Sequence, residues 1–334
     1  MAKDPGAAND CPDLSVQLGP LRLRNPVMVA SGTFGYGSEY MEFVDLRELG
    51  AVVVKGISLE PLPGNPPPRL VETPGGLINA IGLENVGLEA FLAQKLPYLE
   101  GMSVPVIVNI FGNTLEEYGE LARRLDGVPG IVGLEINISC PNVKQGGMVF
   151  GTDPSMAASV VGTVRKAASL PLITKLTPNV TRIGDIARAV VEAGSDMVSC
   201  INTLAAMAVD VFSRRPKLAN VVGGLSGPAV KPVALRCVYE VLQAVSCPVI
   251  GIGGIQNATD ALEFLLLGAR AVQVRTANFV RPTVTVEILE GMRRFLQFQK
   301  IRNIEDYIGT LDTSCLFPFA EETCPVPGTD GREA

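Results

Sequence analysis

The feature that most constrains the fold is a repeated alternation of two kinds of segment. Between most of the strand-like runs lies a stretch with helical periodicity. The apolar runs are continuously hydrophobic and rich in β-branched residues, which is typical of strands covered on both faces. Eight of them recur along the 334-residue chain, at NPVMVAS (25–31), AVVVKGI (51–57), VPVIVNI (104–110), GLEINIS (133–139), PLITKLT (171–177), DMVSCIN (196–202), PVIGIGG (248–254) and AVQVRTA (271–277).

The intervening segments carry apolar residues at helical spacing, and several end in glycine, as helix C-termini often do. They include TLEEYGELARRL, SMAASVVGTVRKAAS, RIGDIARAVVEAG, ALRCVYEVLQAV and ATDALEFLLLGA. Eight strand–helix repeats in a chain of this length favour a closed (β/α)₈ TIM barrel, with an open doubly wound sheet as the alternative.

Three other segments complete the predicted organisation. Residues 14–25 have the pattern of a β-hairpin that closes the bottom of the barrel, and the connections 58–84 and 203–227 are long enough to be functional loop insertions. We expect a mobile N-terminus at 1–12, one barrel domain at 13–310 and a C-terminal tail at 311–334.

The amino-acid composition argues against several classes of function. A net charge of −6 and scattered basic residues argue against nucleic acid and membrane partners, and the start of the chain does not resemble a signal peptide. Seven cysteines without a C-x-x-C pair predict reduced thiols and no closed zinc site. We therefore expect a cytoplasmic protein.

Polar residues gather where the apolar runs end. In a barrel these ends converge on one rim, where active sites are built, so the set predicts a site: Ser31, Lys55, Asn109, Asn137, Cys140, Lys175, Asn202, Gly253, Gly254, Arg275 and Thr276.

The residue types at this rim limit its chemistry. The chain has no histidine, which excludes Ser-His and Cys-His relays, and no carboxylate ends a run, so no metal is expected. Lys55 and Lys175 suit an anionic or electron-rich ligand, or a Schiff base. The glycine pair 253–254 follows the seventh strand, a common place for phosphate in barrels. Cys140 is the obvious proton acceptor, because nearby lysines favour its thiolate.

Long motifs in the chain resemble the class 1 dihydroorotate dehydrogenases, most closely the NAD-linked subclass, class 1B. The resemblance runs from about residue 14 to 309 and rests on SGTFGYGSEY, VVVKGISLEPLPGNPPPRLVETPGG, INAIGLENVG, INISCPNVKQGG, KLTPNV, INTL, GGLSGPAVKPVALR and IGIGGI. It implies a barrel that binds flavin mononucleotide (FMN) and oxidises dihydroorotate to orotate in pyrimidine synthesis.

The resemblance also implies roles for individual residues. Cys140 is expected to take the C5 proton while hydride from C6 goes to the flavin. The residues expected at the FMN are Ser31, Lys55, Gly56, Asn109, Asn137, Lys175, Ile201, Gly227, Gly253, Gly254, Arg275 and Thr276. Those expected at the substrate are Lys55, Asn79, Ala80, Ile81, Gly82, Leu83, Asn137, Asn202 and Thr203.

Partners follow from the same resemblance. It implies a homodimer core joined to a subunit that carries FAD and an iron–sulfur cluster and passes electrons to NAD, since this chain has neither clustered cysteines nor a dinucleotide fingerprint. Fumarate or another soluble acceptor is the alternative. The serine base and N-terminal extension of the quinone-using class are not matched. Cys315 and Cys324 in the tail are expected to be inert.

One position departs from the family pattern, which usually reads V-G-T where this chain has Val274, Arg275 and Thr276. Arginine retains the backbone N–H and adds a cation, so we expect flavin binding to persist. Three rival hypotheses stay open at this point. They are a cysteine-dependent phosphate-binding barrel of the inosine monophosphate dehydrogenase kind, a Schiff-base aldolase, and a flavin-binding or scaffolding subunit inactivated by Arg275.

Overall fold

A closed barrel of eight parallel strands forms the centre of the structure, a computed structural model that describes residues 11–139, 141–142 and 148–314. The last strand pairs with the first, Val274 opposite Val29, so the open-sheet alternative is wrong and the predicted (β/α)₈ barrel is confirmed. In chain order its strands are β3 (Val27–Val29), β4 (Ala51–Val53), β7 (Val106–Ile110), β8 (Ile131–Asn137), β11 (Leu172–Leu176), β12 (Met197–Cys200), β17 (Val249–Ile252) and β18 (Ala271–Val274).

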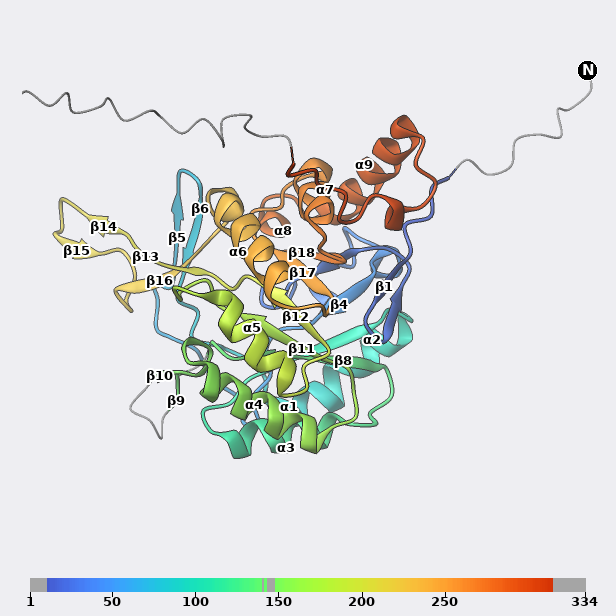
Figure 1. Cartoon of the computed structure of the whole chain (residues 1–334). Coiled ribbons are helices and arrows are strands. Elements are labelled where there is room, and N and C mark those ends of the chain that lie inside the picture. The colour runs from blue at the N-terminus through green and yellow to red at the C-terminus, as the bar shows by residue number, and fades with distance from the viewer. Residues whose placement is uncertain (1–10, 140, 143–147, 315–334) are drawn as a thin grey trace, which may run out of the picture.

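Helices surround this barrel (Figure 1). All five predicted helices are present, and three begin at a side-chain cap, because Thr114, Asp153 and Asn257 each accept a hydrogen bond from a backbone N–H of the first turn. Only short 3₁₀ turns, η1 (Ser38–Tyr40) and η2 (Leu46–Glu48), separate β3 from β4. The helices are α1 (Gly87–Ala90), the π-helical η3 (Phe91–Lys95), α2 (Leu96–Gly101), α3 (Leu115–Leu125), α4 (Pro154–Ala167), α5 (Ile183–Glu192), α6 (Lys231–Ala244), α7 (Ala258–Leu267), α8 (Ala277–Val280) and α9 (Val284–Gln299).

The predicted N-terminal hairpin is confirmed and lies against the amino-terminal ends of the strands. Its strands β1 (Val16–Leu18) and β2 (Leu21–Leu23) pair antiparallel through a turn at Gly19, which has φ +56°. A Cβ on Gly19 would lie 3.2 Å from the side chain of Met197, the first residue of β12. The hairpin therefore closes the end of the barrel opposite the predicted rim.

The two long connections form a second sheet instead of irregular loops. Their strands are β5 (Leu70–Thr73), β6 (Gly76–Asn79), β13 (Leu204–Met207) and β16 (Val222–Ser226), in the order β13-β16-β6-β5. Asn79 of β6 faces Gly224 of β16, so segments about 145 residues apart in the chain meet edge to edge. In Figure 1 this loop sheet lies on the left, at the end of the barrel away from β1.

Smaller elements complete the described chain. β14 (Val209–Asp210) and β15 (Arg215–Pro216) form a hairpin that projects beyond the loop sheet (Figure 1). The others are β9 (Pro141–Asn142), β10 (Met148–Val149), η5 (Phe150–Thr152), η6 (Pro228–Val230) and η7 (Ile304–Asp306). Within the described ranges, every helix is too short or too polar to cross a lipid bilayer.

Candidate active site

Two adjoining cavities lie between the carboxyl ends of the barrel strands and the loop sheet. The mouth cavity has a volume of about 470 Å³ and is lined by the ends of β3, β4, β7, β8, β11 and β12 together with β6 and its following loop. The glycine cavity, of about 480 Å³, is lined by Gly76, Gly227, Gly254 and neighbouring residues. Leu77, Arg275, Thr276 and Phe279 line both cavities. Each has the size of a small-molecule site.

A fully buried carboxylate, Glu135, lies inside the barrel beneath the mouth cavity. It stands two residues before Asn137 on β8, so the strand's two-residue period directs both side chains to the same face. Side chains from four other strands of the barrel, β7, β11, β12 and β18, satisfy its oxygens. The donors are Asn109 Nδ2 at 2.7 Å, Lys175 Nζ at 3.3 Å, Ser199 Oγ at 2.9 Å and Gln273 Nε2 at 2.8 Å.

This network holds the ammonium group of Lys175 at the floor of the cavity. Lys175 is only 2% exposed, and its Nζ also lies 3.3 Å from Ser31 Oγ. Burial by itself would raise the pKa of Glu135, but the Lys175 ammonium and three hydrogen bonds outweigh it, so this pKa is lowered. Burial also lowers the pKa of Lys175, and the attraction of Glu135 offsets only part of that effect. The Lys175–Glu135 contact thus places an amine nitrogen at the floor of the cavity, where it can contact an electron-rich ligand.

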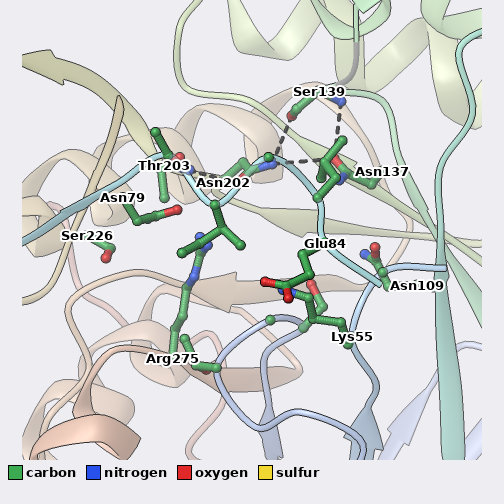
Figure 2. A pocket seen from close by; sticks show the side chains of 18 of the residues that line it. Lys55, Asn79, Glu84, Asn109, Asn137, Ser139, Asn202, Thr203, Ser226 and Arg275 are labelled. Carbon is green, nitrogen blue, oxygen red and sulfur yellow. Dashed lines mark hydrogen bonds between the residues drawn. The ribbon is translucent and has the colours of Figure 1, made fainter. Parts of the chain in front are cut away.

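Lys55 supplies the mouth cavity with a second cation. Its side chain forms no ion pair or hydrogen bond with the part of the chain that the structure describes, and it points into the mouth cavity (Figure 2). Burial lowers the pKa of Lys55, while Glu84 acts in the opposite direction. Glu84 is itself paired with Arg69, with 2.5 Å between Oε2 and Nη2. Lys55 is therefore available to a ligand.

Amide side chains form the opposite wall of the mouth cavity. Asn202 Nδ2 donates to Ser139 Oγ at 2.9 Å and to Asn137 Oδ1 at 3.4 Å, as the dashed lines in Figure 2 show. Asn137 Oδ1 also accepts from the backbone N–H of Ser139, so its Nδ2 remains without a partner among the described residues. From the loop sheet, Asn79 Nδ2 donates to the carbonyl of Gly224 at 3.0 Å, and its Oδ1 has no partner within the described ranges. The wall thus offers both donors and acceptors.

The walls of the glycine cavity depend on the absence of side chains. A Cβ on Gly254 would lie 2.5 Å from the Cβ of Lys231, and one on Gly227 would lie 2.6 Å from the Cα of Gly76. Both glycines have positive φ, +76° and +102°. Backbone groups therefore approach this space closely, while the Thr276 hydroxyl, bonded to Ser226 Oγ at 2.8 Å, lies at its edge.

Most of the predicted site residues come together in these two cavities. The structure places at the mouth cavity Ser31, Lys55, Gly56, Asn79, Ala80, Ile81, Gly82, Leu83, Asn109, Asn137, Lys175, Asn202, Thr203, Arg275 and Thr276. Gly227 and Gly254 line the glycine cavity. Ile201, which is 2% exposed, and Gly253 line neither cavity and lie behind the wall. Cys140, Cys315 and Cys324 lie outside the described residues.

The sequence analysis missed the acidic members of the site. It noted correctly that no carboxylate ends a strand, but Glu135 lies inside β8 and Glu84 comes from a loop. Two signals in the sequence pointed to Glu135: its spacing of two from Asn137, and the need of a buried Lys175 for a counter-charge. Arg69 and Ser139 were also missed. Among the described residues, no group of three or more potential metal ligands occurs.

We predict that Glu135→Gln lowers the free energy of unfolding by about 3–5 kcal/mol, because it leaves the Lys175 ammonium buried without a counter-charge. Urea unfolding at pH 7 measures this loss. The lowered pKa of Glu135 means that its contribution is complete above the ordinary glutamate pKa of about 4.3 and is lost only as pH falls through the lower folded value. The double variant Glu135→Gln, Lys175→Met is the control and should recover part of the loss. A single variant as stable as wild type would contradict the role given to the pair.

Comparisons with known proteins identify the family. The dihydroorotate dehydrogenase family model matches residues 13–296. The catalytic subunit of dihydroorotate dehydrogenase B (NAD(+)) from Geotalea uraniireducens is 60% identical over 302 residues, which cover 90% of this chain and 99% of that protein. The subunits of the same name from Pelobacter propionicus and Geobacter sulfurreducens are 60% and 58% identical, each over 301 residues that cover 90% of this chain and 99% of the relative. With the barrel and its lysine- and amide-lined cavity, these matches show that the chain belongs to the dihydroorotate dehydrogenase family.

Proposed function

We propose that this chain is a catalytic subunit that oxidises dihydroorotate to orotate in the cytoplasm, using FMN, in the de novo synthesis of pyrimidine nucleotides. The observation that carries the proposal is the mouth cavity, where two lysines meet a wall of amides in a chain about 60% identical to named catalytic subunits. Family membership leaves the aldolase and the inosine monophosphate dehydrogenase-like hypotheses without support.

The paired cavities suit an elongated cofactor with a planar head and an anionic tail. The mouth cavity is lined by four cationic side chains, those of Lys55, Arg69, Lys175 and Arg275, and by one carboxylate, that of Glu84. When Glu135 beneath the cavity is also counted, the formal charge of the site is +2. The adjoining glycine cavity offers backbone groups for a phosphate. FMN, when bound, accepts the hydride. As FMN contacts we propose Ser31, Lys55, Gly56, Asn109, Asn137, Lys175, Gly227, Gly254, Arg275 and Thr276, with Ile201 and Gly253 supporting them from behind the cavity wall.

The amide wall complements a cyclic substrate with alternating N–H and C=O groups. An asparagine side chain donates and accepts at once. The Oδ1 of Asn79 and the Nδ2 of Asn137, neither of which has a partner in the described part of the chain, provide one group of each kind. Lys55 can neutralise the substrate carboxylate. The residues proposed to hold the substrate are Lys55, Asn79, Ala80, Ile81, Gly82, Leu83, Asn137, Asn202 and Thr203.

Cys140 is the proposed catalytic base. It follows Ser139, whose hydroxyl accepts the hydrogen bond from Asn202 in the amide wall. Oxidation breaks two C–H bonds: the thiolate takes the proton from C5, and the hydride leaves C6, so that the C5=C6 double bond forms. Lys55 and Lys175 stabilise the negative charge that arrives on the acceptor with the hydride.

We expect the purified chain to be yellow and its visible flavin absorption to bleach when dihydroorotate is added under nitrogen. Two electrons enter the flavin for each substrate oxidised, so the titration should end near one equivalent. Spectrophotometry measures both properties. A colourless preparation that FMN does not restore would contradict the proposal, and colour without bleaching would favour the inactive-subunit hypothesis.

The rate of flavin reduction should rise with pH toward about 8–9 and then level off, because the base acts as a thiolate and an ordinary cysteine has a pKa of about 8.5. Below that pKa the rate should fall by about tenfold per pH unit. Anaerobic stopped-flow measurements at several pH values test this. In the matched variant Cys140→Ala the rate of flavin reduction should be at least about 100-fold lower and should no longer depend on pH. A wild-type rate that is constant from pH 6 to 9 would count against Cys140.

Exposed apolar side chains provide surfaces for the proposed assembly. Val211 and Phe212, at the tip of the β14–β15 hairpin, are 74% and 95% exposed, and Phe279 and Val280, beside the glycine cavity, are 54% and 72% exposed. Apolar patches on a protein surface mark interaction sites. We propose that Val211 and Phe212 form part of the contact between two copies of this chain. We propose that Phe279 and Val280 contact a partner subunit that carries FAD and an iron–sulfur cluster and passes electrons to NAD.

Mass analysis of the untagged complex purified from its native cell should find two copies of this chain with an FAD-containing, iron-containing partner. Phe212→Asp should yield a monomer with its flavin retained, whereas Val280→Asp should release only the partner. Reoxidation of the reduced flavin by NAD⁺ should then require that partner. A chain that stays free of any partner and is reoxidised by fumarate alone would overturn this part of the proposal in favour of a soluble acceptor.

A further inference from the structure

Arg275 occupies the boundary between the two cavities. It follows directly after β18, and it is one of four residues that line both spaces. Figure 2 shows its half-buried side chain pointing from the rim into the mouth cavity. Glycine is the residue that the family pattern leads one to expect here, so this guanidinium is a feature of the present chain.

The Arg275 side chain has no paired counter-charge among the residues that the structure describes. It forms no ion pair and donates no hydrogen bond to any described residue, whereas the buried cation Lys175 is held by Glu135. Burial lowers the pKa of Arg275, and the more distant negative charge of Glu135 offsets only part of this decrease. Arg275 in turn lowers the pKa of both Lys55 and Lys175. A desolvated, unpaired cation near two others is costly unless an anion joins it.

We propose that the Arg275 guanidinium binds the phosphate group of the FMN, an inference that rests on the proposed function. The phosphate is the group that stays negative in every redox state, and the glycine cavity beside Arg275 has the backbone-lined wall that suits it. Guanidinium and phosphate form paired, charge-assisted hydrogen bonds. Arg275 thus adds a cationic side-chain contact to a cavity lined by glycines and Thr276, in which Glu72 is the one carboxylate among the described lining residues.

The flavin ring is the less suitable partner for this cation. Lys55 and Lys175 already supply two cations to the mouth cavity, and the oxidised ring carries no net charge. A third cation gains little there. The phosphate end, by contrast, has no other cationic side chain in its lining than Arg275 among the described residues.

Comparing FMN with riboflavin, which lacks the phosphate, tests the inference. Dissociation constants are measured by flavin fluorescence on the full chain after its flavin is removed, for wild type, Arg275→Met and Arg275→Lys. Arg275→Met keeps an apolar stem of similar length and removes the charge. We expect it to weaken FMN binding by about 10- to 100-fold, the effect of losing a charge-assisted pair, with riboflavin binding changed by less than about threefold. Arg275→Lys should lie between wild type and Arg275→Met.

Arg294→Met, on the exposed face of α9, is the matched control for loss of one positive charge and should bind both flavins as wild type does. Urea unfolding confirms that each variant is folded. An equal loss of FMN and riboflavin affinity would place the guanidinium at the ring and overturn the inference, as would FMN affinity that is unchanged or improved in Arg275→Met. Wild-type protein that binds neither flavin would instead refute the proposed function.

Discussion

The buried carboxylate of Glu135 is the interaction on which the site depends. A charge inside a barrel is tolerated only when its hydrogen-bonding capacity is filled, and here side chains from β7, β11, β12 and β18 all donate to it. The carboxylate therefore ties strands on different sides of the barrel together. It also fixes the amide of Asn109 and the ammonium of Lys175, so the floor of the mouth cavity is organised before any ligand arrives.

Around the mouth cavity, some of the cationic side chains are paired with a carboxylate and others are not. Arg69 pairs with Glu84 and Lys175 pairs with Glu135, while Lys55 and Arg275 lack counter-charges among the described residues. Cations held close together in a partly desolvated space repel one another, which is why Arg275 lowers the pKa of both lysines. An anionic cofactor and an anionic substrate would relieve that repulsion, so binding energy is available from the protein's own electrostatics.

The cover of the site comes from segments that are remote in sequence. β6 and β16 pair across the mouth of the barrel, and the close approach of their backbones requires glycine, since a Cβ on Gly223 would lie 2.7 Å from the carbonyl oxygen of Asn79. The same sheet supplies Asn79 to the amide wall and Leu77 to the wall between the cavities. The cover of the site and part of its amide wall are therefore one structure.

The local pattern of apolar and polar residues determined the barrel strands and much of the candidate site. Continuous apolar runs predicted all eight barrel strands, and because parallel strands end on one rim, Lys55, Asn109, Asn137 and Lys175 could be assigned to a common site before any coordinates existed. Only the tertiary structure decided which groups pair. Glu135 meets Lys175 through the register of adjacent strands, Glu84 enters from a loop, and Ile201 and Gly253 lie behind the cavity wall. Periodicity reports whether a residue is buried, whereas its partners depend on barrel closure and on contacts between segments far apart in the chain.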